Sequence, residues 1–483
     1  MSSAKGHLPA GFRLVLDGAT RRIDAGRVVI GGSPLRVLRL TAGGQRLVDA
    51  LVAGADVPPT GGAQRLVRRL LDAGIAHPVP GPSLFPQVDV TVVVPVRDAV
   101  DGLAHTLGAL GPVAEVIVVD DGSRDARGVA AVVAGHGARL LRHDDSVGPA
   151  AARNAGWVLA ESPVVAFVDA DCVPASGWLP PLLAHLDDPA VAAVAPRITP
   201  AGGHGALGAY EAARSPLDLG VRSGPVRPRS WVPYVPTAAL VVRRSALVEL
   251  DGFDGALRYG EDVDLVWRLG DAGWTVRYEP TVEVTHPVRA SWPAWVAQRV
   301  AYGSAAAPLA RRHPRSIAPL VVGAWSAVVW LLAGLGLRKA ALSTVAVTTA
   351  LLVPRLRGLE RPAVEAARLA GSGHLRAGRA VADAVRRPWW PLALVAALVS
   401  RRARRGVALA VVVPPLVEWA RRRPPLDPLR WTALRLVDDI AYGIGVWVGC
   451  GRERSLAALC PDLTGFPHAE PARAAAVTDA THR

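Results

Sequence analysis

The sequence predicts an α/β protein whose central sheet is mostly parallel. Residues 90–98 (VTVVVPVRD) and 115–123 (EVIVVDDGS) are apolar, rich in β-branched side chains, and end in carboxylates. Runs of this kind are typical of strands that are buried on both faces of a parallel sheet. A third run, at 163–167, leads into the acidic sequence VDADC. Helical stretches at 99–110 and 127–136 follow the first two strands, as expected for βαβ units.

Five aspartates follow the three predicted strands. In open α/β sheets, ligands bind beyond the carboxyl ends of the strands. We therefore expect these side chains to gather on one rim, where they can hold a metal ion and a phosphorylated ligand. The five residues are Asp98, Asp120, Asp121, Asp169 and Asp171.

Residues 1–84 are predicted to form a small separate domain, because 483 residues are too many for one ordinary domain. Residues 11–31 alternate apolar and polar side chains around glycine turns, which favours a hairpin. Helical spacing then follows, with Thr41 as N-cap, and a second short helix ends at Gly74. A linker rich in proline and glycine leads into the α/β unit, which spans residues 85–314.

Residues 315–460 are predicted to be a helical region associated with a membrane. Residues 316–337 run for 22 positions without a charge, which is long enough to cross a bilayer. The shorter apolar segments 388–400 and 406–420 suit re-entrant or interfacial positions. Residues 434–450 contain two aspartates, so we expect an amphipathic helix that lies on the surface rather than a span.

The formal net charge of +14 fits either nucleic acid or a membrane surface as a partner. Arginines cluster beside apolar segments, at 401–405 and 421–423, which is typical of the cytoplasmic flanks of membrane segments and disfavours nucleic-acid binding. The start of the chain has no apolar stretch of a signal peptide, so the front of the chain, with the α/β unit, is expected to face the cytoplasm. The three cysteines predict neither a disulfide framework nor a metal site. Residues 461–483 are alanine-rich and are expected to be disordered.

Asp169 and Asp171 form a D-x-D pair after the third strand. Hard divalent cations prefer carboxylate oxygens, and two aspartates one residue apart can both reach one ion. Such an ion can neutralise a diphosphate leaving group. A lone D-x-D pair often only caps a helix, but its position after a buried strand favours a metal site.

Two further segments have both a structural and a ligand-binding interpretation. The DDGS sequence at 120–123 is either a strand-to-helix turn with a capping side chain or part of a ligand site. In residues 147–156 (VGPAAARNAG), small side chains at a helix start let a ligand approach closely. Arg153 there is either a phosphate- or base-binding residue or a surface arginine on a tightly packed helix.

Residues 252–265 (GFDGALRYGEDVDL) place two aspartates at the start of a helix. A carboxylate in an apolar cleft can act as a general base on a hydroxyl group, and Asp262 is the candidate. Both Asp262 and Asp264 can alternatively cap the helix, and Asp264 is expected to have such a structural role. His286 ends a later strand, where it is either structural or a nitrogen ligand for a metal.

These segments, in this order and at these spacings, resemble family 2 glycosyltransferases with the GT-A fold. The resemblance implies that Asp98 and Asp120 or Asp121 contact the nucleoside of a nucleotide sugar, with Arg153 on the same side. It also implies that Asp169 and Asp171 hold the diphosphate through Mg²⁺ or Mn²⁺, with His286 as a further ligand in some relatives.

The same resemblance implies that Asp262 takes the proton from the acceptor hydroxyl. Attack opposite the departing nucleoside diphosphate then inverts the anomeric centre. Glu261 and Trp267, in the same segment, are placed on the acceptor side.

Residues 1–84 resemble PqqD-like winged-helix domains, through the sequences LRLT and RLLDAG followed by a proline-rich exit. Such domains bind precursor peptides during peptide modification. The three parts together resemble the glycosyltransferases of mycofactocin systems in actinobacteria. That resemblance implies transfer of a hexose, with UDP-glucose as the expected donor, onto a small acceptor derived from a peptide. The incomplete match of Gln298-Arg299-Val300 to the Q-x-x-R-W motif of processive synthases disfavours synthesis of a long polymer.

Two alternatives remain from the sequence. One is a membrane glycosyltransferase that acts on a polyprenyl-linked or cell-envelope glycan, which the apolar C-terminal segments favour. The other is a non-catalytic docking module that brings a modifying enzyme and its peptide to the membrane. The presence of every expected acidic residue disfavours this second alternative.

Overall fold

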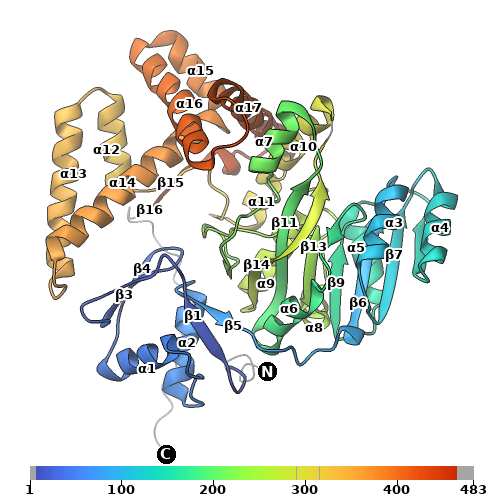
Figure 1. Ribbon diagram of the computed structural model, residues 1–483. Coiled ribbons are helices and arrows are strands. Elements are labelled where there is room, and N and C mark those ends of the chain that lie inside the picture. The colour runs from blue at the N-terminus through green and yellow to red at the C-terminus, as the bar shows by residue number, and fades with distance from the viewer. Residues whose placement is uncertain (1–6, 290, 315, 465–483) are drawn as a thin grey trace, which may run out of the picture. The chain divides into compact units, whose positions relative to one another are not determined.

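The computed structural model describes residues 7–289, 291–314 and 316–464, and its contacts divide the chain into two compact units (Figure 1). The first unit contains Met1–Ile317 and Val412–Ala458, and the second contains Ala318–Val411 and Leu459–Arg483. This division differs from the expected single C-terminal region at 315–460, because residues 412–458 fold with the first unit. Most of the tail that was expected to be disordered, 465–483, lies outside the described residues.

A large mixed sheet forms the centre of the first unit, in the strand order β10-β14-β11-β13-β9-β6-β7-β8. The three predicted strands are confirmed as β6 (Val90–Val96), β7 (Glu115–Asp121) and β9 (Val164–Val168). They pair in parallel with one another or with β8 (Arg139–His143).

The other half of the sheet changes direction at β13 (Ala239–Arg243), which is antiparallel to both β9 and β11 (Val191–Ala201). β11 is in turn parallel to the long strand β14 (Thr275–Pro287). The sheet is therefore mixed rather than mostly parallel. Its short edge strands β10 (Val173–Pro174) and β12 (Gly224–Pro225) both pair with β14.

Both faces of this sheet are buried, as the continuous apolar runs predicted. Val92 and Val94 of β6 belong to one core cluster, and Val93, between them, belongs to the other. Successive strand residues point to opposite faces, so each run must be apolar throughout. The first face is covered by α3 (Val100–Ala109), α4 (Ala126–Gly135) and α6 (Leu179–Leu183). The second is covered by α5 (Pro149–Leu159), α8 (Arg244–Leu250) and α9 (Glu261–Asp271).

The N-terminal residues of the first unit form two small sheets and two helices around their own core. Thr41 caps α1 (Ala42–Val52) as predicted, because its hydroxyl accepts from the Gly44 N–H at 3.1 Å. α2 (Gly61–Asp72) ends before Gly74, whose φ is 67°. The strands are β1 (Arg13–Leu16), β2 (Arg21–Ile23), β3 (Val28–Gly31), β4 (Arg36–Arg39) and β5 (Ala76–Val79).

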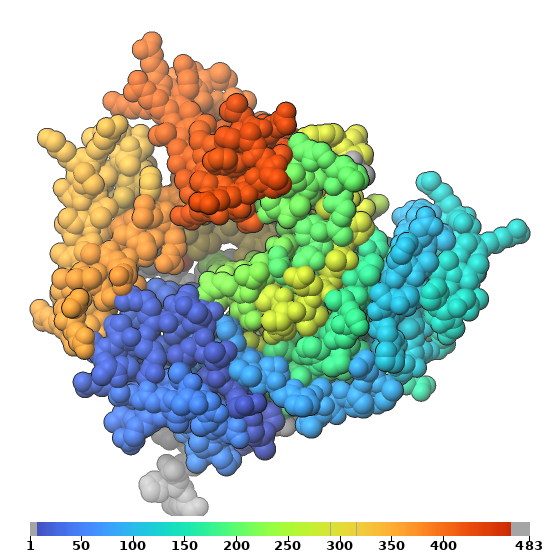
Figure 2. All heavy atoms as spheres, in the orientation of Figure 1, coloured from blue at the N-terminus to red at the C-terminus, as the bar shows by residue number. Residues whose placement is uncertain are grey.

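Figure 2 shows these N-terminal residues, in dark blue, lying against the light-blue segment that leads into the central sheet. A bidentate ion pair joins the two parts, because Arg68 of α2 donates to both carboxylate oxygens of Asp188, at 2.6 and 3.0 Å. The N-terminal domain is thus docked on the side of the sheet where β11 and β14 begin, away from the carboxyl ends of β6, β7 and β9.

Helices that follow β14 complete the first unit. α10 (Trp292–Ser304) and α11 (Ala306–Arg312) follow each other directly. α17 (Pro428–Glu453), from much later in the chain, packs along α10 and also contacts α11. α7 (Gly205–Arg214) packs with them around buried Tyr210, Trp295 and Trp431. Residues 434–450, expected as a helix on the surface, are instead largely buried within this unit.

The second unit is helical, with one short parallel pair formed by β15 (Val321–Gly323) and β16 (Asp462–Thr464). The segment predicted as one span at 316–337 is broken by β15, and its helix α12 (Ala324–Gly334) has 11 residues. At 1.5 Å per residue such a helix is about 16 Å long, too short to cross a bilayer. The other helices are α13 (Arg338–Leu352), α14 (Pro362–Arg386), α15 (Trp390–Val399) and α16 (Arg401–Arg422), which continues into the first unit.

Among the described residues, one helical stretch, Arg338–Leu356, is long and apolar enough to cross a membrane. It comprises α13 and the short 3-10 helix that follows it, Val353–Leu356.

Candidate active site

The predicted rim lies at the carboxyl ends of β6, β7 and β9. Val96 of β6 pairs with Asp120 of β7, so the residues that follow both strands leave the sheet at the same edge. The backbone N–H of Asp98 donates to Ser123 Oγ at 2.9 Å, which ties the two loops together. Gly102 lies against the Ala170 carbonyl, within the D-x-D loop. The rim therefore brings Asp98, Asp120 and the D-x-D loop to one edge.

Asp98 is the exposed carboxylate of this rim. Its φ of 53° is left-handed, a conformation that is uncommon for a residue with a side chain. The carboxylate accepts from the Arg124 N–H at 2.8 Å, and this bond together with Ser123 holds the turn. Asp98 is thus fixed in position while its side chain remains accessible to a ligand.

Asp120 is completely buried and is satisfied by its own chain. One carboxylate oxygen accepts from the Ser123 N–H at 2.9 Å, and the other is paired with Arg142 of β8. This is the capping role that the sequence offered as the structural interpretation of the DDGS turn.

Asp121 holds the loop that precedes α5. Its two oxygens accept from Ser146 Oγ at 2.7 Å, from the backbone N–H groups of Val147 and Gly148 at 2.9 Å each, and from His143 Nδ1 at 3.1 Å. Burial alone would raise the pKa of Asp121, but these hydrogen bonds outweigh it and lower the pKa. The carboxylate is therefore ionised and shapes the start of α5.

Arg153 connects the D-x-D loop to the start of α9. Its Nη2 donates to Asp169 Oδ1 at 2.7 Å, and its Nη1 donates to Glu261 Oε1 at 2.8 Å. The side chain is 4% exposed and also lies over the ring of Phe253. Burial opposes its charge, but the carboxylates of Asp169 and Glu261 outweigh that effect and raise its pKa. The structure thus places Arg153 between carboxylates, not on the surface.

Asp262 lies in the first turn of α9, next to Glu261, and its pKa is strongly raised. Burial, followed by the negative charge of Glu261, raises its pKa to about 7, although the Val263 N–H and Arg153 act in the opposite direction. A carboxylate with a pKa near neutrality can accept a proton efficiently at physiological pH. Gly260, just before the helix, is required by the local backbone. Its φ is 80°, and a Cβ at this position would lie 2.9 Å from Leu309.

Asp264 has a structural role, as expected, but through contacts with His313 and Arg268 and not as a helix cap. Its buried carboxylate accepts from His313 Nε2 at 3.0 Å and from Arg268 Nε at 2.7 Å. These bonds attach the first turn of α9 to the end of α11. Asp264 therefore fixes the helix that presents Asp262.

Asp171 and His286 approach each other across the D-x-D loop and the end of β14. His286 Nε2 lies 3.7 Å from Asp171 Oδ1, and the Asp171 side chain is 30% exposed. Asp169, the other D-x-D carboxylate, is equally exposed but already shares one oxygen with Arg153. Within the described part of the chain, no group of three or more His, Cys, Asp or Glu side chains forms a complete metal site. Asp171 nevertheless offers carboxylate oxygens, which suit Mg²⁺ or Mn²⁺, and His286 lies close enough to add a nitrogen donor.

The two residues that were placed on the acceptor side are both buried. Glu261 is 7% exposed and is paired with Arg153. Trp267 is 6% exposed, donates from its indole N–H to the Pro233 carbonyl at 2.7 Å, and meets His313 edge-on. Trp267 is thus a core residue that supports α9.

The sequence did not reveal the residues that pair with the carboxylates of Asp120 and Asp121, because they do so through tertiary contacts. Arg142 and His143 end β8, a strand that carries no continuous apolar run, and Ser146 follows it. The acidic sequence at 120–121, next to a basic pair at 142–143, was the available signal.

The chain matches known glycosyltransferases in sequence. Residues 91–248 match the family described as glycosyl transferase family 2. Over 471 residues the chain is 43% identical to a protein named pre-mycofactocin glycosyltransferase from Mycobacterium tuberculosis (strain ATCC 25618 / H37Rv), covering 94% of this chain and 98% of that protein. Over 202 residues it is 33% identical to an N-acetylglucosaminyl-diphospho-decaprenol L-rhamnosyltransferase of the same strain, covering 35% of this chain and 66% of that protein.

Solved structures are more distant. A mannosyltransferase from Pyrobaculum calidifontis, in complex with GDP-Man and Mn²⁺, has a TM-score of 0.38 and 17% identity, covering 74% of this chain and 90% of that one. A likeness at this level carries no argument about ligands. Membership of a family therefore rests on the match that extends over nearly the whole chain.

Proposed function

Because the chain belongs to the family of pre-mycofactocin glycosyltransferases, we propose that it transfers a hexose to a small peptide-derived acceptor. The proposed transfer inverts the configuration at the anomeric carbon. The proposed donor is UDP-glucose. The observation that carries the proposal is Asp262, a carboxylate at the start of α9 whose pKa is raised to about 7 beside Glu261, Arg153 and the D-x-D loop.

In this reaction Asp262 accepts the proton of the acceptor hydroxyl as its oxygen forms a bond to the anomeric carbon of the sugar. The bond between that carbon and the diphosphate oxygen breaks, and the nucleoside diphosphate leaves with the electron pair. Because the base and the leaving group lie on opposite faces of the sugar, the configuration inverts. Asp264, His313 and Arg268 hold α9, so that Asp262 is positioned before the substrate binds.

Arg153 supports the reaction from beneath the site. Its positive charge partly neutralises the carboxylates of Asp169 and Glu261 near Asp262. This limits how far the pKa of Asp262 rises. Exposed Asp98 is proposed to contact the nucleoside, while Asp120 and Asp121 shape the surface on which it lies.

We also propose a divalent cation, Mg²⁺ or Mn²⁺, held by Asp171 and by the free oxygen of Asp169, with His286 as a further ligand. The 3.7 Å approach of His286 to Asp171 and the partial exposure of both aspartates support this assignment. When bound, such an ion supplies charge neutralisation for the departing diphosphate.

The extent of the sequence match favours this function over transfer to a polyprenyl-linked glycan. The match to the pre-mycofactocin glycosyltransferase covers 94% of the chain, whereas the match to the decaprenol-linked rhamnosyltransferase covers 35%. A shared catalytic fold alone would account for the shorter match.

We further propose that the second unit associates with the cytoplasmic face of a membrane. Large apolar side chains of α13 and α15, such as Leu342, Leu398 and Val399, are exposed by 70% or more. Arginines at 401–405 follow α15 directly, and basic residues beside an apolar helix favour an anionic lipid surface. Flotation with vesicles that contain anionic lipid tests this, because protein that stays at the bottom of the gradient contradicts it.

Mass spectrometry of a reconstituted reaction tests the main proposal. The purified chain, incubated with UDP-glucose, Mn²⁺ and pre-mycofactocin, is expected to add hexose to the acceptor and to release UDP. Asp262→Asn should bind UDP with unchanged affinity and lose at least about 100-fold in turnover, since general base catalysis contributes about 10²–10⁴-fold. Near-normal turnover by Asp262→Asn would show that another group is the base.

A further inference from the structure

α17 is packed against α10 at a distance that only glycine permits. A Cβ on Gly445 of α17 would lie 2.0 Å from the Val300 carbonyl oxygen and 2.9 Å from Gly303 Cα. A Cβ on Gly449, one turn later, would lie 2.4 Å from the Ser304 carbonyl oxygen. Backbones this close leave the two helices little freedom to shift relative to each other. α17 therefore sets the position of α10.

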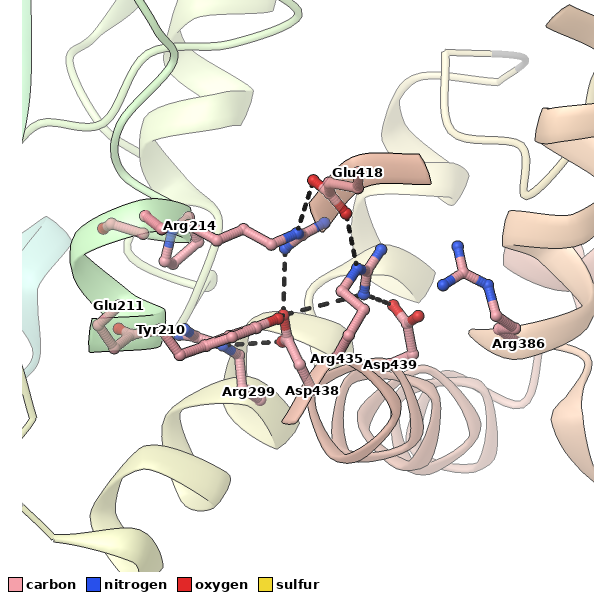
Figure 3. Close-up of polar contacts among 12 residues, drawn as sticks. Tyr210, Glu211, Arg214, Arg299, Arg386, Glu418, Arg435, Asp438 and Asp439 are labelled. Carbon is pink, nitrogen blue, oxygen red and sulfur yellow. Dashed lines mark hydrogen bonds and ion pairs between the residues drawn. The ribbon is translucent and has the colours of Figure 1, made fainter. Parts of the chain in front are cut away.

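A buried network of charged side chains reinforces this contact (Figure 3). Asp438 of α17 accepts from Tyr210 Oη at 2.8 Å, from Arg214 Nη1 at 3.1 Å and from Arg299 Nε at 2.9 Å. Arg299 of α10 is also paired with Glu211 of α7. Each of the two acids and Arg299 is at most 3% exposed. Because an unpaired charge at such a buried site is strongly destabilising, the network favours one arrangement of the three helices.

The network continues toward the active site through Gln298. Arg299 Nη1 donates to Gln298 Oε1 at 3.0 Å, and Gln298 Nε2 donates to Tyr302 Oη at 3.1 Å. The phenol oxygen accepts this bond, so its own proton is available to donate. Tyr302 is partly exposed, unlike Arg299 behind it. A chain of hydrogen bonds thus leads from Asp438 through Arg299 and Gln298 to the hydroxyl group of Tyr302.

Tyr302 lies near the end of α10, where the chain approaches the segment that carries the proposed base. Burial raises the pKa of its phenol, and the negative charge of Asp262 acts in the same direction, although Arg299 opposes both. Independently of charge, the residues that follow Tyr302 contact the loop before α9. Ala305 and Leu309 are the nearest neighbours of Gly260, two residues before Asp262.

We propose that Tyr302 is an acceptor-positioning residue, and that α17 acts through Arg299 and Gln298 to hold its hydroxyl beside Asp262. This inference rests on the proposed function, because it assigns Tyr302 to the acceptor of that reaction. The hydroxyl would donate to an oxygen of the acceptor, while Asp262 takes the proton from the attacking one. Tyr302 lies outside the family 2 match, which ends at residue 248.

Tyr302→Phe in the full-length protein tests the inference, since it removes only the hydroxyl. Three quantities are measured: the acceptor KM with pre-mycofactocin, the donor KM with UDP-glucose, and the hydrolysis of UDP-glucose without acceptor. We expect the acceptor KM to rise about tenfold, the size of one lost hydrogen bond, with the donor KM and hydrolysis unchanged. Tyr278→Phe, which removes a buried phenol that donates to the Gly220 carbonyl, is the control and should change none of the three.

Asp438→Asn and Gln298→Ala test the connection to α17. Both are expected to raise the acceptor KM in the same direction with a smaller effect, and Gln298→Ala serves where Asp438→Asn fails to fold. An unchanged acceptor KM in Tyr302→Phe overturns the inference, and so does a parallel loss of hydrolysis.

Failure of the proposed function has a different signature. In that case the wild-type protein hydrolyses UDP-glucose but glycosylates no pre-mycofactocin. In that case the role of Tyr302 is tested with glycerol as a surrogate acceptor. The ratio of glucosylated glycerol to free glucose should be lower for Tyr302→Phe than for the wild type. Equal ratios in the two proteins overturn the inference.

Discussion

Arg153 Nη1 donates to Glu261 Oε1 at 2.8 Å, although the two residues are separated by 108 positions in the sequence. The same guanidinium donates to Asp169, so one buried cation joins the D-x-D loop to the segment that carries the proposed base. The two halves of the site are therefore coupled through a single side chain that contacts neither Asp171 nor His286 in the described contacts.

Replacing Arg153 by lysine should lower both turnover and stability. A lysine keeps the charge, but its single ammonium cannot span Glu261 and Asp169 in the way that the planar guanidinium does. Loss of one partner of a buried pair costs about 3–5 kcal/mol, so the melting temperature should fall in calorimetry. Turnover is expected to fall at least about tenfold. An unchanged melting temperature and rate would show that the pairing contributes little.

The reaction rate should increase with pH through about pH 7, since Asp262 must be deprotonated to accept a proton and its pKa is raised to about 7. Below that pH, kcat/KM should fall about tenfold per pH unit.

Stability should change in the opposite direction with pH. Because the folded-state pKa of Asp262 exceeds that of the unfolded chain, the folded protein binds the extra proton between about pH 4 and pH 7. The contribution of Asp262 to stability is therefore lost as the pH rises through that window. Asp262→Asn removes this effect, so its melting temperature relative to wild type should increase from pH 5 to pH 8. A difference that is constant with pH would contradict the raised pKa.

Chelation of divalent cations should abolish transfer, and Mn²⁺ or Mg²⁺ should restore it. His286→Ala is expected to raise the Mn²⁺ concentration needed for half-maximal activity about 10-fold or more, since losing a metal-site partner typically costs about 10–100-fold in affinity. His136→Ala, on the exposed end of α4, is the matched control. Full activity in the presence of chelator would remove the cation from the proposed mechanism.

Asp121→Asn should weaken donor binding, because the loop before α5 depends on four donors to this carboxylate. An amide keeps one acceptor oxygen but presents N–H groups to backbone N–H groups. The donor KM is expected to rise several-fold, and the melting temperature to fall. Asp145→Asn, on the exposed part of the same loop, should leave both unchanged.

Gly445→Ala should destabilise the first unit, because its Cβ would lie 2.0 Å from a backbone oxygen of α10. Overpacking of this kind costs about 1–3 kcal/mol. Gly451→Ala is the control on the same helix, since a Cβ there meets nothing within 4 Å. If both variants melt at the same temperature, the close contact of α17 with α10 is not a determinant of stability.

The strands and their acidic ends could be read from the sequence, because a parallel sheet buried on both faces requires runs such as VTVVV and VIVV. The capping residue Thr41 and the helix end at Gly74 were also predictable, since each depends on neighbours a few positions away. Asp264 was expected to be structural for the same kind of local reason.

Only the tertiary structure decided which acidic residues are structural and which are accessible to a ligand. Asp120 and Asp121 are satisfied by Arg142 and by the loop at 143–148, and Trp267 lies in the core. These roles depend on which side chains meet across the fold, and no spacing along the chain records that. The same reason explains α17, whose two aspartates suggested a helix on the surface until Arg299 and Arg435 were found to neutralise them. Local pattern thus determined the elements, and long-range charge pairing determined which residues form the site.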